Sequence, residues 1–322
     1  MVHILDDSVP KPLKYEECVA LCKKRIYDIC PHGRPPGEMR IYYNANVHEC
    51  KDNTDSKGTR AIICKFDVKK SCAVAGRRPA GLLEREVTAE FPVQEVDTVQ
   101  PSEFEQAGAF FAELAYLEKA AVTAFVYLAM ELEHYGAPDE LIQLAKQGVK
   151  EELEHVELMK MLAKIYGAEP QKVAVEPFRL RPLVEIAEEN AREGCIRETF
   201  GALLAMWQAR HAEEEAVRRV MERISYEESL HGALSWKIDE WIQSKLTSDE
   251  KKRCQQAHQE ALTIIQQELQ QEQNPALIRY CGFPNREQSN LLYQQLKAEL
   301  WSESTVVPVS IDSNSEDVTT FA

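Results

Sequence analysis

The stretch from Ser102 to Lys245 constrains the fold most, because it is long and contains very few helix breakers. Its strong turn signals are Gly136-Ala-Pro138, Gly167-Ala-Glu-Pro170 and the segment from Pro177 to Pro182. The stretch therefore predicts four helices, at residues 102–135, 139–166, 182–211 and 213–245. The turn between the last two, near Ala212, has the weakest signal.

Two other kinds of sequence flank these helices. In the first hundred residues, Arg40-Ile-Tyr-Tyr43 and Ala61-Ile-Ile-Cys64 predict short strands. After the fourth helix, Thr247-Ser-Asp-Glu250 has the form of a capping box and predicts a fifth helix to about Glu272, and a sixth is expected from Asn285 to Trp301. We divide the chain into a Cys-containing N-terminal segment with short strands (1–100), a four-helix block (101–246), C-terminal helices (247–301) and a flexible tail (302–322).

Six of the nine cysteines lie in the N-terminal segment: Cys18, Cys22, Cys30, Cys50, Cys64 and Cys72. An even number in a short segment is compatible with three disulfides, although no export signal places the chain in an oxidising compartment. Free thiols are a second reading. A zinc site, with help from His32 and His48, is a third, but the Cys-x-x-Cys pairs of common zinc sites are missing. The sequence leaves the state of these cysteines open.

The net charge of −15 argues against nucleic acid as a partner, because it would repel a phosphate backbone and no basic stripe offsets it. No run approaches the roughly 20 apolar residues that a membrane span needs, so we expect no membrane association. The polar start of the chain resembles neither a signal peptide nor an anchor. We expect a cytoplasmic protein, or an exported one if a leader precedes this sequence.

Three Glu-x-x-His pairs occur in the helical stretch, and this spacing places a carboxylate and an imidazole on one helix face, one turn apart. Glu152/His155 and Glu228/His231 lie in the middle of the second and fourth helices. Glu131/His134 ends the first helix, next to a turn, and we interpret it as a solvated helix end rather than a pair of ligands.

In four-helix bundles that hold two metal ions, two helices each contribute Glu-x-x-His and the other two contribute one glutamate each. On the first helix we select Glu118, because it shares a face with Phe111, Val122 and Phe125, whereas Glu113 and Glu131 point away from that face. On the third helix we favour Glu198 over Glu193, because small residues line its face.

The predicted metal ligands are therefore Glu118, Glu152, His155, Glu198, Glu228 and His231. Six such groups at one level of a core would be too costly to bury without a cation. Oxygen ligands with two imidazoles suit iron or manganese, and a pair of such ions can pass electrons to dioxygen. We expect two Fe ions, with Mn as an alternative in one or both positions.

Four segments carry a resemblance to a known family: Gly108-Ala-Phe-Phe-Ala-Glu-Leu-Ala-Tyr-Leu-Glu118, Glu151-Glu-Leu-Glu-His155, Glu193-Gly-Cys-Ile-Arg-Glu-Thr199 and Glu227-Glu-Ser-Leu-His231. They resemble the ferritin-like di-iron carboxylate superfamily and, more narrowly, an uncharacterised bacterial branch of it. Cys72 to Leu82 and Tyr280 to Trp301 are also similar to that branch. The resemblance implies a mainly α fold, a ferritin-like antiparallel four-helix bundle.

The superfamily includes iron stores, peroxide scavengers, hydroxylases and desaturases, so the fold does not fix the activity. Rubrerythrin-type peroxidases usually carry paired Cys-x-x-Cys motifs that are missing here, and cage ferritins are shorter chains. Phe125 occupies a position where many ferritin-like proteins carry tyrosine.

The leading hypothesis is a non-haem di-iron oxidase or oxygenase with an unidentified small-molecule or carrier-bound substrate and an unidentified electron donor. The sequence is compatible with a homodimer. The alternatives are iron oxidation and storage or peroxide detoxification, and a metal-stabilised scaffold or binding protein.

Overall fold

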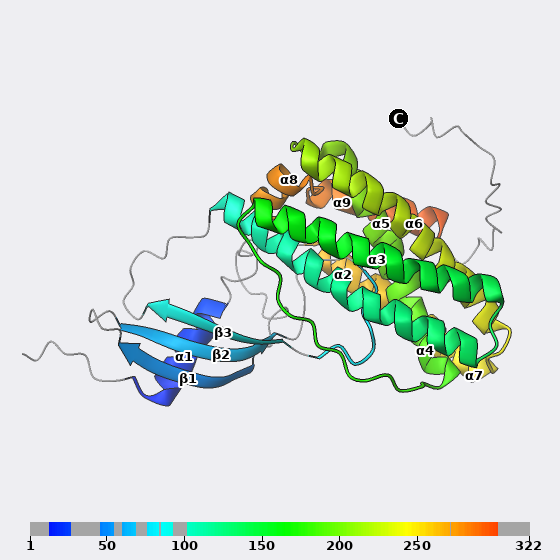
Figure 1. Cartoon of the computed structure of the whole chain (residues 1–322), viewed down its shortest axis with the longest axis horizontal. Coiled ribbons are helices and arrows are strands. Elements are labelled where there is room, and N and C mark those ends of the chain that lie inside the picture. Colours follow the sequence, from blue (N-terminus) through cyan, green and yellow to red (C-terminus); the bar gives the residue numbers. More distant parts are fainter. Residues whose placement is uncertain are drawn as a thin grey trace, which may run out of the picture.

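The computed structural model describes residues 13–26, 46–54, 60–68, 76–83, 85–92, 102–270 and 272–301. Within these ranges the chain is mainly helical, as the sequence predicts. Figure 1 shows the long helices side by side and a small sheet with its own helix beside them. None of the described helices combines the length and the apolar character needed to cross a membrane.

The first two long helices form a hairpin. Helix α2 spans Glu103–His134 and α3 spans Asp139–Ile165, with the predicted Gly136-Ala-Pro138 turn between them. Helix α2 begins at a capping box in which Ser102 Oγ accepts a hydrogen bond from the Glu105 amide and Glu105 accepts one from the Ser102 amide. The two helices lie side by side (Figure 1), and both contribute buried apolar side chains to the core.

The third predicted helix is present, but its geometry is not uniform. It consists of α4 (Leu183–Glu189), a π-helical stretch η1 (Asn190–Glu198) and α5 (Thr199–His211). A π-helix is wider than an α-helix, with i→i+5 hydrogen bonds, and it changes which residues share a face. The fourth helix, α6, spans Glu215–Gln243.

Three further helices follow. Helix α7 (Ser248–Glu268) begins at the predicted capping box, in which Glu250 accepts a hydrogen bond from the Thr247 amide at 2.9 Å. Helix α9 spans Arg286–Glu299, close to the expected sixth helix. The short α8 (Pro275–Cys281) was not predicted. The Asn274 side chain caps its N-terminus, and the left-handed Gly282 ends it.

The N-terminal part contains more regular structure than predicted. Strands β1 (Asn46–Thr54), β2 (Arg60–Val68) and β3 (Arg85–Pro92) form an antiparallel sheet in the order β1-β2-β3, and α1 (Tyr15–Ile26) packs against β1 and β2. The expected strand at Ala61–Cys64 lies inside β2. The expected strand at Arg40–Tyr43 and the expected tail at 302–322 lie outside the described residues.

Residues 76–83 follow the sheet's second strand and run against the long helices. The Leu83 amide donates to the Ala174 carbonyl at 3.0 Å, and the Glu176 amide donates to the Gly81 carbonyl at 2.9 Å. This segment is thereby fixed to the connection between α3 and α4. It inserts Arg77, which is fully buried, among the helices.

The long helices enclose two separate apolar cores. One core contains Leu117, Met159, Phe200 and Ile224. The second core includes Phe125, Ala145, Ile186 and Ile238. Between the two lies a layer of buried polar side chains, and this layer contains the candidate site.

Candidate metal centre

The structure brings all six predicted ligands together in the polar layer. Glu118 comes from α2, Glu152 and His155 from α3, Glu198 from the end of η1, and Glu228 and His231 from α6. Each of them is at most 5% exposed. Buried charged side chains are rare unless they are paired or bind a metal, so a layer of this composition needs an explanation.

The ligand atoms form two groups, each with all members within 4.8 Å of one another. One group contains Glu118, Glu152, His155 and Glu228, and the other contains Glu152, Glu198 and His231. Glu152 belongs to both. Its Oε2 lies 3.6 Å from His155 Nδ1 and its Oε1 lies 3.4 Å from His231 Nδ1.

Glu228 has the same relation to the two histidines, with Oε1 at 3.3 Å from His155 Nδ1 and Oε2 at 3.6 Å from His231 Nδ1. Two ligands of one ion, each about 2.0–2.2 Å from it, lie about 3.0–3.5 Å apart. The separations therefore suit metal coordination, and Glu152 and Glu228 each lie within reach of both histidines.

Every one of the six side chains has a buried polar atom that accepts or donates no hydrogen bond among the described residues. These atoms are Glu118 Oε2, both Glu152 carboxylate oxygens, His155 Nδ1, Glu198 Oε1, Glu228 Oε1 and His231 Nδ1. Native structures leave few buried polar atoms without a partner, because each one costs about 1–3 kcal/mol. A cation is the partner that carboxylate oxygens and imidazole nitrogens share, and these residues fit a metal pair.

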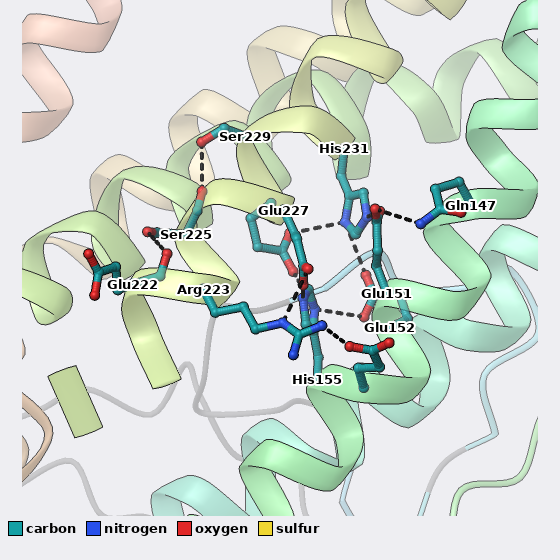
Figure 2. Close-up of polar contacts among 12 residues, drawn as sticks. Gln147, Glu151, Glu152, His155, Glu222, Arg223, Ser225, Glu227, Ser229 and His231 are labelled. Atoms are coloured by element: carbon teal, nitrogen blue, oxygen red, sulfur yellow. Dashed lines mark hydrogen bonds and ion pairs between the residues drawn. The ribbon is translucent and has the colours of Figure 1, made fainter. Parts of the chain in front are cut away.

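The outer nitrogens of the two histidines are held by two further carboxylates that the sequence analysis missed. His155 Nε2 lies 2.7 Å from Glu227 Oε2, and His231 Nε2 lies 2.9 Å from Glu151 Oε2 (Figure 2). Because a carboxylate can only accept, each imidazole donates from Nε2 and turns Nδ1 toward the centre. The signal was present as a Glu-Glu doublet that opens both motifs.

These contacts are reciprocal between the two helices. Glu227 on α6 holds the histidine of α3, and Glu151 on α3 holds the histidine of α6 (Figure 2). Gln147 donates to Glu151 at 3.0 Å, and Arg223 lies 3.3 Å from Glu227, so both carboxylates are themselves held in place. The arrangement fixes the imidazole planes before any ligand binds.

We expect Glu227→Gln to weaken metal binding about 10- to 100-fold while leaving the fold intact, because this is the usual effect of losing a carboxylate behind a metal-bound histidine. The affinity would be measured by competition with a chelator. Glu222→Gln, an exposed position on the same helix, is the matched control and should bind as the original chain does. Equal affinities for both variants would show that Glu227 does not support His155 as a ligand.

Burial and mutual repulsion shape the acidity of the site. Burial, together with the neighbouring carboxylates Glu152 and Glu228, raises the pKa of Glu118 well above its usual range. Burial disfavours the charged form of His155, but the nearby carboxylates of Glu152 and Glu228, 3.6 and 3.3 Å from its Nδ1, outweigh this effect and raise its pKa to about 12. For Glu228, burial raises the pKa, but the neighbouring His155 and His231 outweigh this effect and lower the pKa to about 2. Without a cation, the carboxylates hold protons on the histidines.

Glu198 is a special case, because burial raises its pKa to about 7 even though the positive charge of Arg77 opposes the rise. Burial disfavours the charged form of His231, but Glu151, Glu152 and Glu228 outweigh it and raise its pKa well above the usual value. Metal ions must therefore displace protons from His155, His231 and Glu118, and a further proton from Glu198 below about pH 7. For each proton that a metal ion displaces, the metal affinity increases by as much as about tenfold when the pH rises by one unit.

We therefore expect the affinity to rise with pH, and to rise more steeply below pH 7 than above it. Chelator competition between pH 5.5 and 8.5 would measure both slopes. In Glu198→Gln the steeper part should disappear, since no carboxyl titrates there. A single unbroken slope in the unmodified chain would contradict this account of Glu198.

The π-helical stretch and Arg77 together position Glu198. Ser235 Oγ lies 3.0 Å from Glu198 Oε2 and 3.5 Å from Arg77 Nη1, while Arg77 also donates to Glu189 at 3.2 Å and to Asn190 at 3.1 Å. Only glycine fits at position 194, because an added Cβ would lie 2.4 Å from Ser235 Oγ. The wide turn and Gly194 thus leave room for the guanidinium beside the site.

Gly76 lies against Glu118, at another side of the site. It has a left-handed φ of 58°, and an added Cβ would lie 2.9 Å from Glu118 Oε2. The segment that carries Arg77 therefore approaches the centre closely enough to exclude water from Glu118. Phe125 covers another side, with its ring centroid 4.7 Å from that of His231.

Glu193, the alternative on the third helix, lies outside both groups. Its side chain is 17% exposed and lies 3.8 Å from Arg197. We expect Glu198→Ala to weaken the ion next to His231 first, and Glu193→Ala to leave the metal content unchanged. Counting metal ions per chain in both variants tests this, and the opposite pattern would assign the ligand to Glu193.

The Glu131/His134 pair contributes nothing to either group, in agreement with its exclusion as a ligand pair. The reason given for Glu131 was wrong, however, because this residue is buried rather than solvated. Arg181 donates to both of its oxygens, at 2.7 Å each, and also pairs with Glu189. Glu131 is thus neutralised by an arginine, and His134 is exposed.

The charges of the donor set fit two divalent cations. Four carboxylates among the six residues carry four negative charges, and two neutral imidazoles add none. Oxygen and nitrogen donors without thiolates favour iron or manganese over metals that prefer sulfur. Comparison of the chain with protein-family models, with curated proteins and with solved structures found no match, so the functional argument depends on the geometry of this site.

Proposed function

We propose that this chain is a ferritin-like four-helix bundle whose centre holds two iron ions, with manganese as the alternative metal, and that it acts as a non-haem oxidase or oxygenase on an organic substrate. The observation that carries the proposal is that each of the six predicted ligands, on four different helices, has at least one buried atom without a hydrogen-bond partner. A structural ion-pair network would have satisfied these atoms within the protein.

The side chains divide the work of the proposed centre. Glu152 and Glu228, which each lie close to both histidines, would hold the ions together with His155, His231, Glu118 and Glu198. When bound, an iron pair supplies electrons to dioxygen two at a time. Glu227 and Glu151 keep the imidazoles oriented, and the Gly76–Arg77 segment and Phe125 keep water away from the ligands.

Glu198 has a further part in this proposal. With a pKa of about 7, it is the site carboxyl whose proton can be taken up or released near neutral pH. Ser235 Oγ contacts its other oxygen and is itself contacted by Arg77, so a change in the protonation of Glu198 need not move the side chain far.

Anaerobic loading with Fe²⁺, followed by mixing with dissolved oxygen, tests the proposal. We expect about two irons per chain and rapid oxygen consumption in proportion to bound iron, both absent in His155→Ala. Mineralisation of many irons per chain would favour storage, and a faster reaction with peroxide than with oxygen would favour detoxification. Bound iron that consumes neither oxidant would favour a metal-stabilised scaffold and contradict the enzyme.

A further inference from the structure

Four cysteines converge where α1 packs on the sheet, far in the sequence from the metal centre. Cys18 and Cys22 lie one turn apart on α1, and Cys50 and Cys64 are direct partners on β1 and β2. Directly opposed residues of an antiparallel pair share a sheet face, so all four side chains meet in the layer between helix and sheet. All four are buried, and none is more than 9% exposed.

In the structure these residues form two disulfides, Cys18–Cys50 and Cys22–Cys64. The disulfides lie against each other: Cys22 Sγ and Cys50 Sγ, which belong to different bonds, are 3.1 Å apart. The sulfurs of Cys18, Cys22 and Cys50 lie within 4.8 Å of one another, and Cys64 is bonded to Cys22. The four sulfurs therefore occupy one small volume.

This spacing matches a tetrahedral tetrathiolate site. With Zn–S bonds of about 2.3 Å, the four sulfurs of such a site lie about 3.8 Å apart. Reduction would free the sulfurs to take up this separation, because those of Cys18, Cys22 and Cys50 already lie within 4.8 Å of one another. The one-turn pair on α1 and the cross-strand pair supply two ligands each, which replaces the Cys-x-x-Cys loops of common zinc sites.

We propose that, when the two disulfides are reduced, Cys18, Cys22, Cys50 and Cys64 bind one zinc ion. A dithiol reductant gives two electrons and two protons to each disulfide and is itself oxidised to a disulfide. The four thiols then release four protons as four Zn–S bonds form. The same cross-link between α1 and the sheet is thus made by sulfur–sulfur bonds under oxidising conditions and by a metal under reducing conditions.

The choice of metal follows from the donors. Thiolate sulfur selects zinc over manganese in a closed four-coordinate site, whereas the carboxylate and imidazole groups of the other centre accept iron and manganese as well. The proposal does not depend on the activity proposed above.

The test uses the full-length chain, stripped of metal and kept either oxidised or reduced with a phosphine, and titrated with Co²⁺ and Zn²⁺. Cobalt bound by thiolates gives an intense sulfur-to-cobalt charge-transfer absorption that carboxylate and imidazole ligands do not give. We expect this absorption for one cobalt per chain in the reduced protein, its displacement by zinc, and none in the oxidised protein.

Alkylation of the reduced chain, mapped by peptide mass, identifies the ligands without any substitution. Zinc should protect Cys18, Cys22, Cys50 and Cys64 together. Cys64→Ser should remove most of the cobalt absorption, and Cys254→Ser, a free buried cysteine elsewhere, should keep it. Absence of the absorption in the reduced chain, or protection of Cys30 or Cys72 in place of these four, would overturn the proposal.

Discussion

Glu152→Ala should remove both metal ions, not one. Glu152 belongs to both groups of ligand atoms, and each of its oxygens lies close to a different histidine. Its loss would leave two cations close together in a low-dielectric core without one of the charges between them, at a cost of several kcal/mol. We expect the metal content to fall from about two ions per chain to nearly none, and iron-dependent oxygen consumption to fall with it.

Two variants make this result specific. Glu157→Ala changes an exposed carboxylate on the same helix, 73% exposed, and should keep its metal and its activity. Glu152→Gln keeps the shape of the side chain but removes its charge, and should fall between the two. Full metal content in Glu152→Ala would mean that the polar layer is an ion-pair network and not a metal centre.

Arg77→Met should strongly destabilise the fold, although Arg77 lies outside the set of predicted ligands. Arg77 is fully buried and is inserted among the helices, where it contacts the side chains of Glu189, Asn190 and Ser235. Removing one partner from a buried ion pair typically costs about 3–5 kcal/mol, because the remaining charge is left desolvated. Arg181 still pairs with Glu189 in the variant, so we expect the lower end, about 3 kcal/mol, by urea denaturation.

The matched comparison is Arg253→Met. Arg253 also pairs with a glutamate, Glu188, but it lies at the surface, where such pairs contribute little. Arg77→Lys keeps the charge but loses the planar fork and should lose an intermediate amount of stability. If Arg77→Met were no more destabilising than Arg253→Met, the segment at residues 76–83 would not be anchored through its arginine.

Much of the site could be predicted from sequence because its ligands lie on regular helices. A spacing of three residues brings Glu152 and His155 to one face of any α-helix. The apolar residues that share a face with Glu118 show that its side chain points to the core. The turn signals separated the helices well, apart from the π-helical stretch inside the third.

That stretch explains why Glu198 and Glu193 were hard to separate. A helical projection at 100° per residue assumes α geometry, and η1 departs from it over residues 190–198, which include both candidates. The choice of Glu198 rested on small residues such as Gly194, and the structure gives these a specific reason: they admit Ser235 and Arg77.

The remaining features depend on contacts between distant segments, which periodicity does not encode. Arg77 precedes the first long helix by many residues, and its partners on α4, η1 and α6 could not be read from spacing. Glu131 was misjudged for the same reason, because Arg181 reaches it from the connection before α4. The partners of the N-terminal cysteines likewise required the register of β1 and β2.

The polar layer between the two apolar cores also bears on how the chain folds as a unit. Helices α2, α3 and α6 pass through both cores, and at the level of the layer they have carboxylates and imidazoles in place of hydrophobic contacts. Bound ions would join the helices that supply the ligands at the polar layer. Without ions, the two ends of the bundle can unfold separately on either side of this layer. The ions would therefore determine whether this bundle unfolds in one cooperative step or as two halves.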